Sequence, residues 1–149
     1  SKLDKENIKA FIIGKEKNLK DYINFAQDLG IDDKVIFTGP REDVIDFYNA
    51  SDFFILPTHY EPFSNVVLEA LHSRNIVITT KQNGACEILD DKFIMKSPDD
   101  FTIVPTINKY LEDKEMLEKT KNDNRLLSNQ FSIEKNLHET LEVINEVIN

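Results

Sequence analysis

Cysteine is almost absent from this sequence, since Cys86 is the single one among 149 residues. A lone cysteine cannot form an internal disulfide bridge, and Cys86 has no histidine or second cysteine at the spacing of a zinc site. These absences exclude a disulfide-stapled scaffold and favour a reducing, cytoplasmic setting. The chain must therefore be stabilised by a hydrophobic core, for which its 40% hydrophobic content is sufficient.

Long hydrophobic runs are missing as well. No apolar stretch approaches the roughly 18 to 20 residues that cross a bilayer, and the start of the chain lacks the apolar segment of a signal peptide. We therefore expect a soluble domain that does not insert directly into a membrane.

Positive charge is scarce. The 18 lysines and arginines are outnumbered by 27 aspartates and glutamates, which gives a formal net charge of −9. This charge repels nucleic acid, and no basic stripe interleaved with aromatic residues is present, so we expect no nucleic-acid partner. An anionic ligand would have to be held by a local positive feature such as the N-terminus of a helix.

Two patterns alternate along the chain. Short apolar runs rich in branched residues are followed by amphipathic segments, which predicts strand–helix–strand units and a parallel sheet. We expect strands at residues 10–13, 34–38, 53–56, 76–80 and, more weakly, 93–95. We expect helices at residues 19–29, 42–50, 64–71, 106–112, 114–129 and 131–147, with a further helix start at residues 97–100 and a break at Pro105. The predicted fold class is α/β, a Rossmann-like parallel sheet with helices on both faces, in a single domain of residues 1–149.

Glycine is rare, and its positions are informative. Three of the four glycines, Gly14, Gly39 and Gly84, follow predicted strands, whereas Gly30 ends a predicted helix. Ligands of open parallel sheets bind beyond the carboxyl ends of the strands, and glycine permits close backbone approach there. Loops between strands and helices also need glycine for their turns alone, so each glycine by itself fits either interpretation.

The loop after the third predicted strand, residues 57–64, leads into a new helix. Ser64 or Asn65 can cap this helix, whose free backbone N–H groups would bind phosphate without a basic side chain. Glu61 precedes the helix and Glu69 lies inside it. One carboxylate can accept both hydroxyls of a diol such as ribose, so we interpret the two acids as acceptors for different parts of one ligand.

Residues 50–57 and 61–71 closely resemble the hallmark of family 4 glycosyltransferases, two glutamates separated by seven residues. The resemblance extends to residues 11–14, 35–39 and 84–88, in the family's order and approximate spacing, and covers nearly the whole chain. It implies the C-terminal half of the two-lobed GT-B architecture, the lobe that binds a nucleotide-sugar donor.

The resemblance implies roles for individual residues. Glu69 would hold the ribose of the nucleotide, and Glu61, the candidate catalytic residue, would contact the hydroxyls of the donor sugar. Gly14 would contact the nucleotide-sugar, and residues Thr38, Gly39 and Arg41 would belong to the edge of the base pocket, with Arg41 as a stacking plane. His59 would line the sugar pocket, although an ordinary polar loop position explains it equally well. Oxygens of sugar and phosphate would be received by the backbone amides of Phe63, Ser64, Asn65, Val66 and Val67.

The resemblance also implies a reaction. Family 4 enzymes retain anomeric configuration and generally use no metal, so we expect no cofactor and no metal, with positive protein groups stabilising the leaving diphosphate. The leading hypothesis is a hexosyltransferase that moves a sugar from a UDP- or GDP-sugar to a cell-surface glycan, lipopolysaccharide or glycolipid, in the cytoplasm and at the membrane periphery. A non-enzymatic nucleotide-sugar-binding module and part of a nucleotide-sugar epimerase are the alternatives. A dinucleotide dehydrogenase is disfavoured because no Gly-x-Gly-x-x-Gly segment is present.

The sequence departs from the family pattern in several places. Pro62 stands where glycine often follows the first glutamate, and residues 73–75 replace a small-residue and glycine segment. The family's phosphate-clamping arginine and lysine belong to a strand–helix unit before the one containing Gly14, which this sequence lacks. We therefore expect a truncated donor domain that is inactive without an N-terminal acceptor lobe. The apolar stripe of the terminal helix is expected to pack partly on its own sheet and partly on that lobe.

Overall fold

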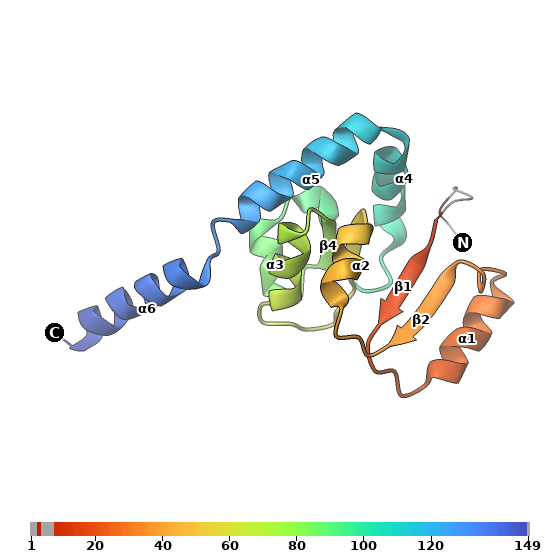
Figure 1. The fold of residues 1–149 in the computed structure, drawn as a ribbon, viewed down its shortest axis with the longest axis horizontal. Helices are drawn as coiled ribbons and strands as arrows, with labels where there is room; N and C mark the ends of the chain where they lie inside the picture. Colours follow the sequence, from red (N-terminus) through yellow and green to blue (C-terminus); the bar gives the residue numbers. More distant parts are fainter. Residues whose placement is uncertain (1–2, 4–7, 149) are drawn as a thin grey trace. The chain divides into compact units, whose positions relative to one another are not determined.

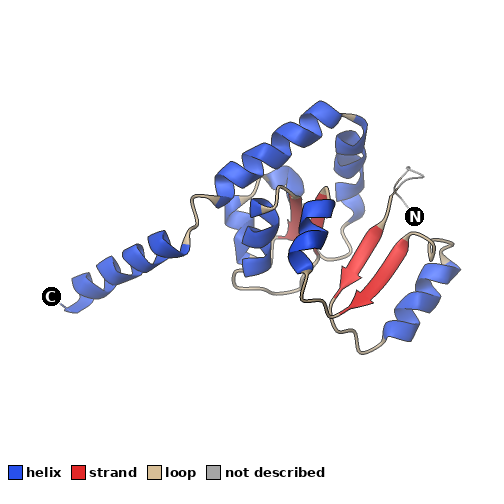
Figure 2. Cartoon of the chain, viewed as in Figure 1, coloured by secondary structure: helices blue, strands red, loops and turns tan. Residues whose placement is uncertain are grey.

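The computed structural model of the chain describes residue 3 and residues 8–148. Strands and helices alternate in its first two thirds, and helices alone form the last third (Figures 1 and 2). The strands are β1 (Ala10–Ile13), β2 (Val35–Gly39), β3 (Phe53–Leu56), β4 (Ile76–Thr80) and β5 (Ile94–Met95). The α-helices are α1 (Leu19–Asp28), α2 (Val44–Ala50), α3 (Asn65–His72), α4 (Val104–Glu112), α5 (Lys114–Ser128) and α6 (Ile133–Ile148). Short 3-10 helices occupy Gly84–Ile88, Asp91–Phe93 and Phe101–Ile103.

The described strands pair in parallel throughout, which confirms the predicted α/β fold class with parallel sheets flanked by helices. They form two hydrogen-bonded sheets, β1-β2 and β3-β4-β5, where the sequence predicted one. The chain divides into two compact units, one ending at Phe47 and the other beginning at Tyr48. Each unit therefore carries one of the two sheets.

In the first unit, β1 and β2 pair in register from Ala10 opposite Val35, and the register shifts between Ile12 and Ile13. Helix α1 connects the two strands (Figure 1). The ring of Phe11 on β1 meets the edge of Phe47 at a centroid distance of 5.4 Å. The unit brings the loops after both strands to the same edge of its sheet, because both strands run in the same direction.

The core of the second unit is centred on β4. All five residues of this strand are buried, as expected for a parallel strand with neighbours on both sides. Side chains of α3 pack against it, and Val67, Ala70 and Leu71 are fully inaccessible to solvent. Each fully buried side chain of the size of Leu71 or Ile76 contributes about 1.5 to 3 kcal/mol to stability. Helix α3 is therefore fixed rigidly at the end of β3.

Helix α3 ends in a turn that the sequence predicted to be less permissive than usual. The N–H of Arg74 donates to the carbonyl of Leu71 and that of Asn75 to Ala70, which is the Schellman pattern of a helix C-terminus. Glycine normally occupies the left-handed position of this motif, whereas here Arg74 adopts φ of 65°. The Arg74 Nε atom is also buried without a hydrogen-bond partner among the described residues.

We expect Arg74→Gly to raise the free energy of unfolding by about 0.5 kcal/mol, since relief of the left-handed backbone (~1 kcal/mol) exceeds the loss of an exposed ion pair. That pair joins Arg74 Nη2 to Glu118 at 2.8 Å. Thermal unfolding of Arg74→Gly beside Glu118→Gln separates the two terms, because Glu118→Gln removes this pair and the 3.6 Å pair of Glu118 with Lys121 but leaves the left-handed backbone of Arg74 in place. A lower midpoint for Arg74→Gly than for Glu118→Gln would contradict the expectation.

The segment between β5 and α4 differs from the prediction. A helix start at residues 97–100 is wrong, because the Ser97 hydroxyl donates to the Asp99 carboxylate instead of capping a helix, and Asp100 caps the 3-10 helix Phe101–Ile103. The Asp100 carboxylate accepts hydrogen bonds from the Thr102 hydroxyl and from the backbone N–H groups of Lys96 and Thr102, and these bonds lower its pKa to about 2. Pro105 does not break the stretch, because it lies in the first turn of α4, where its missing N–H is not needed.

Helix α6 carries the predicted apolar stripe, but none of its described side chains is buried. Ile133 is 83% exposed, and Leu137, Leu141, Ile144 and Ile148 are exposed as well. The expectation that part of this stripe covers the helix's own sheet is therefore wrong. No helix within the described ranges is long and apolar enough to cross a membrane.

Candidate functional site

The loop that carries Glu61 is fixed by main-chain bonds to the loop after β4. The N–H of Glu61 donates to the carbonyl of Gln82 at 3.1 Å, and the N–H of Gly84 donates to the carbonyl of Glu61 at 2.9 Å. Glu61 and Asn83 thus form a parallel bridge that continues the β3-β4 pairing beyond the strand ends. The half-buried Glu61 is held at the carboxyl edge of the sheet, where the sequence placed it.

Gly84 is required by this arrangement. A Cβ atom built on Gly84 would lie 1.8 Å from the carbonyl oxygen of Pro62, a distance that no side chain can occupy. Asn83 supports the same turn, because its side chain accepts from the N–H of Ala85 at 3.0 Å and donates to the Thr79 hydroxyl at 3.0 Å. Thus the loops that follow β3 and β4 meet at Glu61.

The N-terminus of α3 presents free donors. Ser64 is the N-cap residue in extended conformation, and its side chain makes no capping bond. Within the described part of the chain, the backbone N–H groups of Phe63, Asn65 and Val66 donate to no protein group, whereas Val67 N–H donates to the Ser64 carbonyl. The buried Val67 and Ser64 anchor this end to the core. The open amides and the positive end of the helix dipole together suit an oxyanion.

Glu69 lies about one turn further along α3 and is exposed. Oε2 accepts the hydroxyl of Tyr48 at 3.4 Å. Tyr48 belongs to the helix that was predicted at residues 42–50, and no sequence pattern predicted its contact with Glu69. Burial, and then the charge and hydrogen bond of Glu69, raise the pKa of Tyr48 to about 12.

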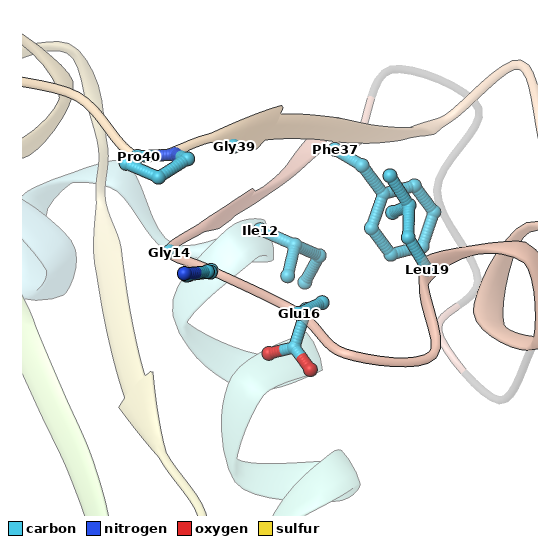
Figure 3. A pocket seen from close by; sticks show the side chains of 8 residues that line it. Ile12, Gly14, Glu16, Leu19, Phe37, Gly39 and Pro40 are labelled. Carbon is cyan, nitrogen blue, oxygen red and sulfur yellow. The ribbon is translucent and has the colours of Figure 1, made fainter.

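In the first unit, the two predicted glycine turns meet. The N–H of Gly14 donates to the carbonyl of Gly39 at 3.1 Å, and both glycines have positive φ, 141° and 69°. Thr38 Oγ1 reinforces the contact by bonding to the carbonyls of Ile12 and Gly39. Beside this contact is a pocket of about 140 Å³ (Figure 3). It is lined by Ile12, Gly14, Lys15, Glu16, Leu19, Phe37, Gly39 and Pro40.

Arg41 does not line this pocket. Its guanidinium makes two hydrogen bonds to the carboxylate of Asp43, at 2.7 and 2.5 Å, and lies over the ring of Phe47. The hydrogen bond and charge of Asp43 raise the pKa of Arg41, and Arg41 in turn lowers that of Asp43. The pocket is instead lined by Lys15, which follows Gly14 in the chain and was not among the predicted site residues.

The remaining predicted site residue, His59, is exposed in the second unit. The pKa of Asp99 is lowered by its hydrogen bond with Ser97 and by the backbone, and to a smaller extent by the nearby His59. The predicted residues therefore gather in two groups, one within each unit: Gly14, Thr38 and Gly39 around the pocket, and Glu61, the start of α3 and Glu69 along the second loop. Residues that could hold a metal ion do not cluster anywhere in the described ranges.

The sequence model of a family described as glycosyl transferases group 1 matches residues 1–127. The chain is similar to the capsular polysaccharide biosynthesis glycosyltransferase CapM of Staphylococcus aureus, with 31% identity over 135 residues. That match covers 85% of this chain and 34% of CapM, so the chain spans about a third of the length of this relative.

Solved structures share the fold. The structure of Anabaena HepE in complex with UDP matches with a TM-score of 0.84 and 22% identity, over 95% of this chain and 42% of that one. The same protein has been solved with UDP-glucose. The C-terminal domain of the group 1 glycosyl transferase LpcC from Francisella tularensis matches with a TM-score of 0.73 and 22% identity, over 82% of this chain and 68% of that one. At these identities the likeness establishes the fold.

Proposed function

Because the chain belongs to the glycosyl transferases group 1 family, we propose that it is the C-terminal donor-binding domain of a family 4 glycosyltransferase of GT-B architecture. The enzyme transfers a hexose, with retention of anomeric configuration, from a UDP- or GDP-sugar to a cell-surface glycan, lipopolysaccharide or glycolipid. The name of CapM supports the class of acceptor, the UDP complexes of HepE support the class of donor, and the LpcC domain supports the C-terminal position.

One observation carries the proposal: the open amide end of α3 lies between two glutamates on one rigid stretch of chain. Three free N–H groups receive the diphosphate, and the helix dipole stabilises the charge that develops as the sugar leaves. Glu69, at the exposed face of α3, accepts the ribose hydroxyls. Glu61, whose backbone is clamped to Asn83, accepts hydroxyls of the donor sugar. No metal ion or cofactor is needed for these contacts.

The pocket of the first unit suits the nucleotide base. Ile12 and Phe37 give it an apolar floor, while the bare backbone at Gly14 and Gly39 lets a flat ring approach closely. Pro40, rather than Arg41, borders the ring, because Asp43 holds the guanidinium away from the pocket.

Further parts complete the enzyme. An N-terminal lobe binds the acceptor, closes over the donor and excludes water from the anomeric carbon. The exposed apolar stripe of α6 provides a surface that packs on that lobe. The family's phosphate-clamping arginine and lysine lie on a strand–helix unit before Gly14. Without that unit and the N-terminal lobe, residues 1–149 do not catalyse sugar transfer. The enzyme works in the cytoplasm at the membrane periphery.

The proposal is tested by comparing two variants of the full-length protein with free nucleotide and with nucleotide-sugar. Glu69→Gln is expected to weaken binding of UDP or GDP by about 1.5 to 3 kcal/mol, the strength of hydrogen bonds to a charged group. Glu61→Ala is expected to leave the free nucleotide unaffected and to weaken only the sugar-bearing donor. Isothermal titration calorimetry measures both, with the exposed Glu115→Gln on α5 as a control that changes neither. Wild-type affinity in Glu69→Gln, or equal losses for both ligands in Glu61→Ala, would refute the assigned roles.

A further inference from the structure

Tyr48 connects the buried core of the second unit to the candidate ribose acceptor. Its side chain is only 6% exposed, and its ring packs edge-on against Phe54 of β3 at a centroid distance of 5.6 Å. The hydroxyl emerges from this packing at Glu69 Oε2, 3.4 Å away. A rigid, buried ring thus holds one hydrogen-bond donor against an exposed carboxylate.

The backbone of Tyr48 is itself held by a hydrogen bond from a buried side chain. The buried side-chain amide of Asn75 donates to the Tyr48 carbonyl at 2.9 Å. Asn124 of α5 donates in turn to the carbonyl of Asn75 at 2.8 Å. This chain of polar contacts runs from α5 through the turn after α3 to the end of α2, and none of its links before Glu69 depends on solvent-exposed side chains.

We propose that Tyr48 is a positioning residue, whose hydroxyl orients the Glu69 carboxylate to receive both hydroxyls of the donor's ribose. The inference rests on the proposed function and extends it to a residue outside the two-glutamate segment. Tyrosine gives one proton to Oε2 and leaves Oε1 and the remaining lone pairs to accept from the ligand. The distance of 3.4 Å is longer than an optimal O–H···O bond, and such contacts commonly tighten when ligand binds.

The role requires a hydroxyl that stays protonated. The raised pKa of Tyr48, about 12, meets this requirement, because the group remains a donor throughout the neutral range. A fixed carboxylate also favours ribonucleotide donors over deoxyribonucleotides, since the hydroxyls are what it recognises. Tyr48 thereby contributes to the choice of ligand without touching it.

The test is Tyr48→Phe in the full-length protein, which keeps the ring and its packing and removes only the hydroxyl. We expect UDP to bind about fivefold more weakly, the equivalent of one hydrogen bond of ~1 kcal/mol. The matched control is Tyr110→Phe, another buried tyrosine of the same unit, whose hydroxyl contacts Thr120 and not Glu69. This control is expected to leave UDP affinity unchanged.

Two further measurements separate positioning from a structural effect. In a Glu69→Gln background, Tyr48→Phe should cause a much smaller additional loss, because the two residues act as one unit. The affinity of 2′,3′-dideoxy-UDP, which lacks both ribose hydroxyls, should be the same for Tyr48→Phe and wild type.

The outcomes distinguish a failure of the Tyr48 inference from a failure of the proposed function. If Glu69→Gln weakens UDP binding while Tyr48→Phe matches wild type, Tyr48 has no positioning role and the proposed function stands. If Tyr48→Phe weakens UDP equally with and without Glu69, or weakens the dideoxy ligand as much as UDP, the inference is overturned. If Glu69→Gln itself leaves UDP affinity intact, the ribose role of Glu69 fails, and the inference fails with it.

Discussion

Gly84→Ala is expected to lower the free energy of unfolding by about 3 kcal/mol and to abolish binding of the sugar-bearing donor. The added methyl carbon would lie 1.8 Å from the Pro62 carbonyl oxygen, far inside van der Waals contact. A backbone atom cannot rotate away as a side chain does, so one of the two loops must move. Either movement breaks the bridge between Glu61 and Asn83 and shifts the Glu61 carboxylate away from the donor.

The effect is measured by urea unfolding and by calorimetry with UDP and a UDP-sugar. Gly30→Ala is the control for a glycine replacement without a clash, because a Cβ there meets nothing within 4 Å although φ is +64°. That control should cost only about 1 kcal/mol, the strain of a left-handed alanine. Gly84→Ala must be clearly the more damaging of the two, and affinity for free UDP should fall less than affinity for the sugar donor. A Gly84→Ala protein with normal stability and donor binding would show that the Glu61 loop is not clamped as described.

The strands were predictable because their residue types strongly favour extended structure. The run Ile76–Thr80 is continuous and β-branched, and such a segment fits a strand buried on both faces. β1, β3 and β4 were placed with their observed bounds, and β2 begins one residue later than predicted. The division into two sheets was not predictable, since pairing depends on contacts between segments that periodicity does not report. Around Pro105, local rules conflicted: the same residue can break a helix or begin one, and the cap at Asp100 decided the outcome.

For the candidate site, the sequence located the loops but not their partners. It predicted that Gly84 would allow close approach, yet the group approached, the Pro62 carbonyl, depends on the pairing of residues 61 and 83. The family resemblance implied that Arg41 stacks on a ligand, but its guanidinium is hydrogen-bonded to the carboxylate of Asp43, two residues later. The contact of Tyr48 could not be predicted, because a tyrosine on an apolar helix face usually only packs in the core. Its partner Glu69 lies 21 positions away in the sequence.

Asn75→Ala is expected to destabilise the protein by about 3 kcal/mol, through the loss of buried hydrogen bonds of about 1 kcal/mol each and the cavity that remains. The side chain is fully buried, and its Nδ2 group lies within hydrogen-bonding distance of the carbonyls of Tyr48, Ala70 and Ser73, at 2.9, 3.2 and 3.3 Å. Asn124→Ala, which removes a single bond to the Asn75 carbonyl, is the milder control, at about 1 kcal/mol. Urea unfolding measures both, and equal losses would show that the Asn75 amide is not the centre of this network.

Asn75→Asp is a second test of the same buried position, because it keeps the side-chain shape and replaces the donor by a charge. At neutral pH the carboxylate would face three carbonyl oxygens in a buried site, so this variant should be less stable than Asn75→Ala. Burial and the carbonyls raise the pKa of such a carboxyl in the folded state, and the protonated form can again donate to one of them. The raised folded-state pKa means that the deficit of Asn75→Asp relative to Asn75→Ala should shrink as the pH falls from 7 towards 5. A deficit that does not change over this range would place the Asn75 side chain in contact with water, and Tyr48 would then lack the buried anchor on which its contact with Glu69 depends.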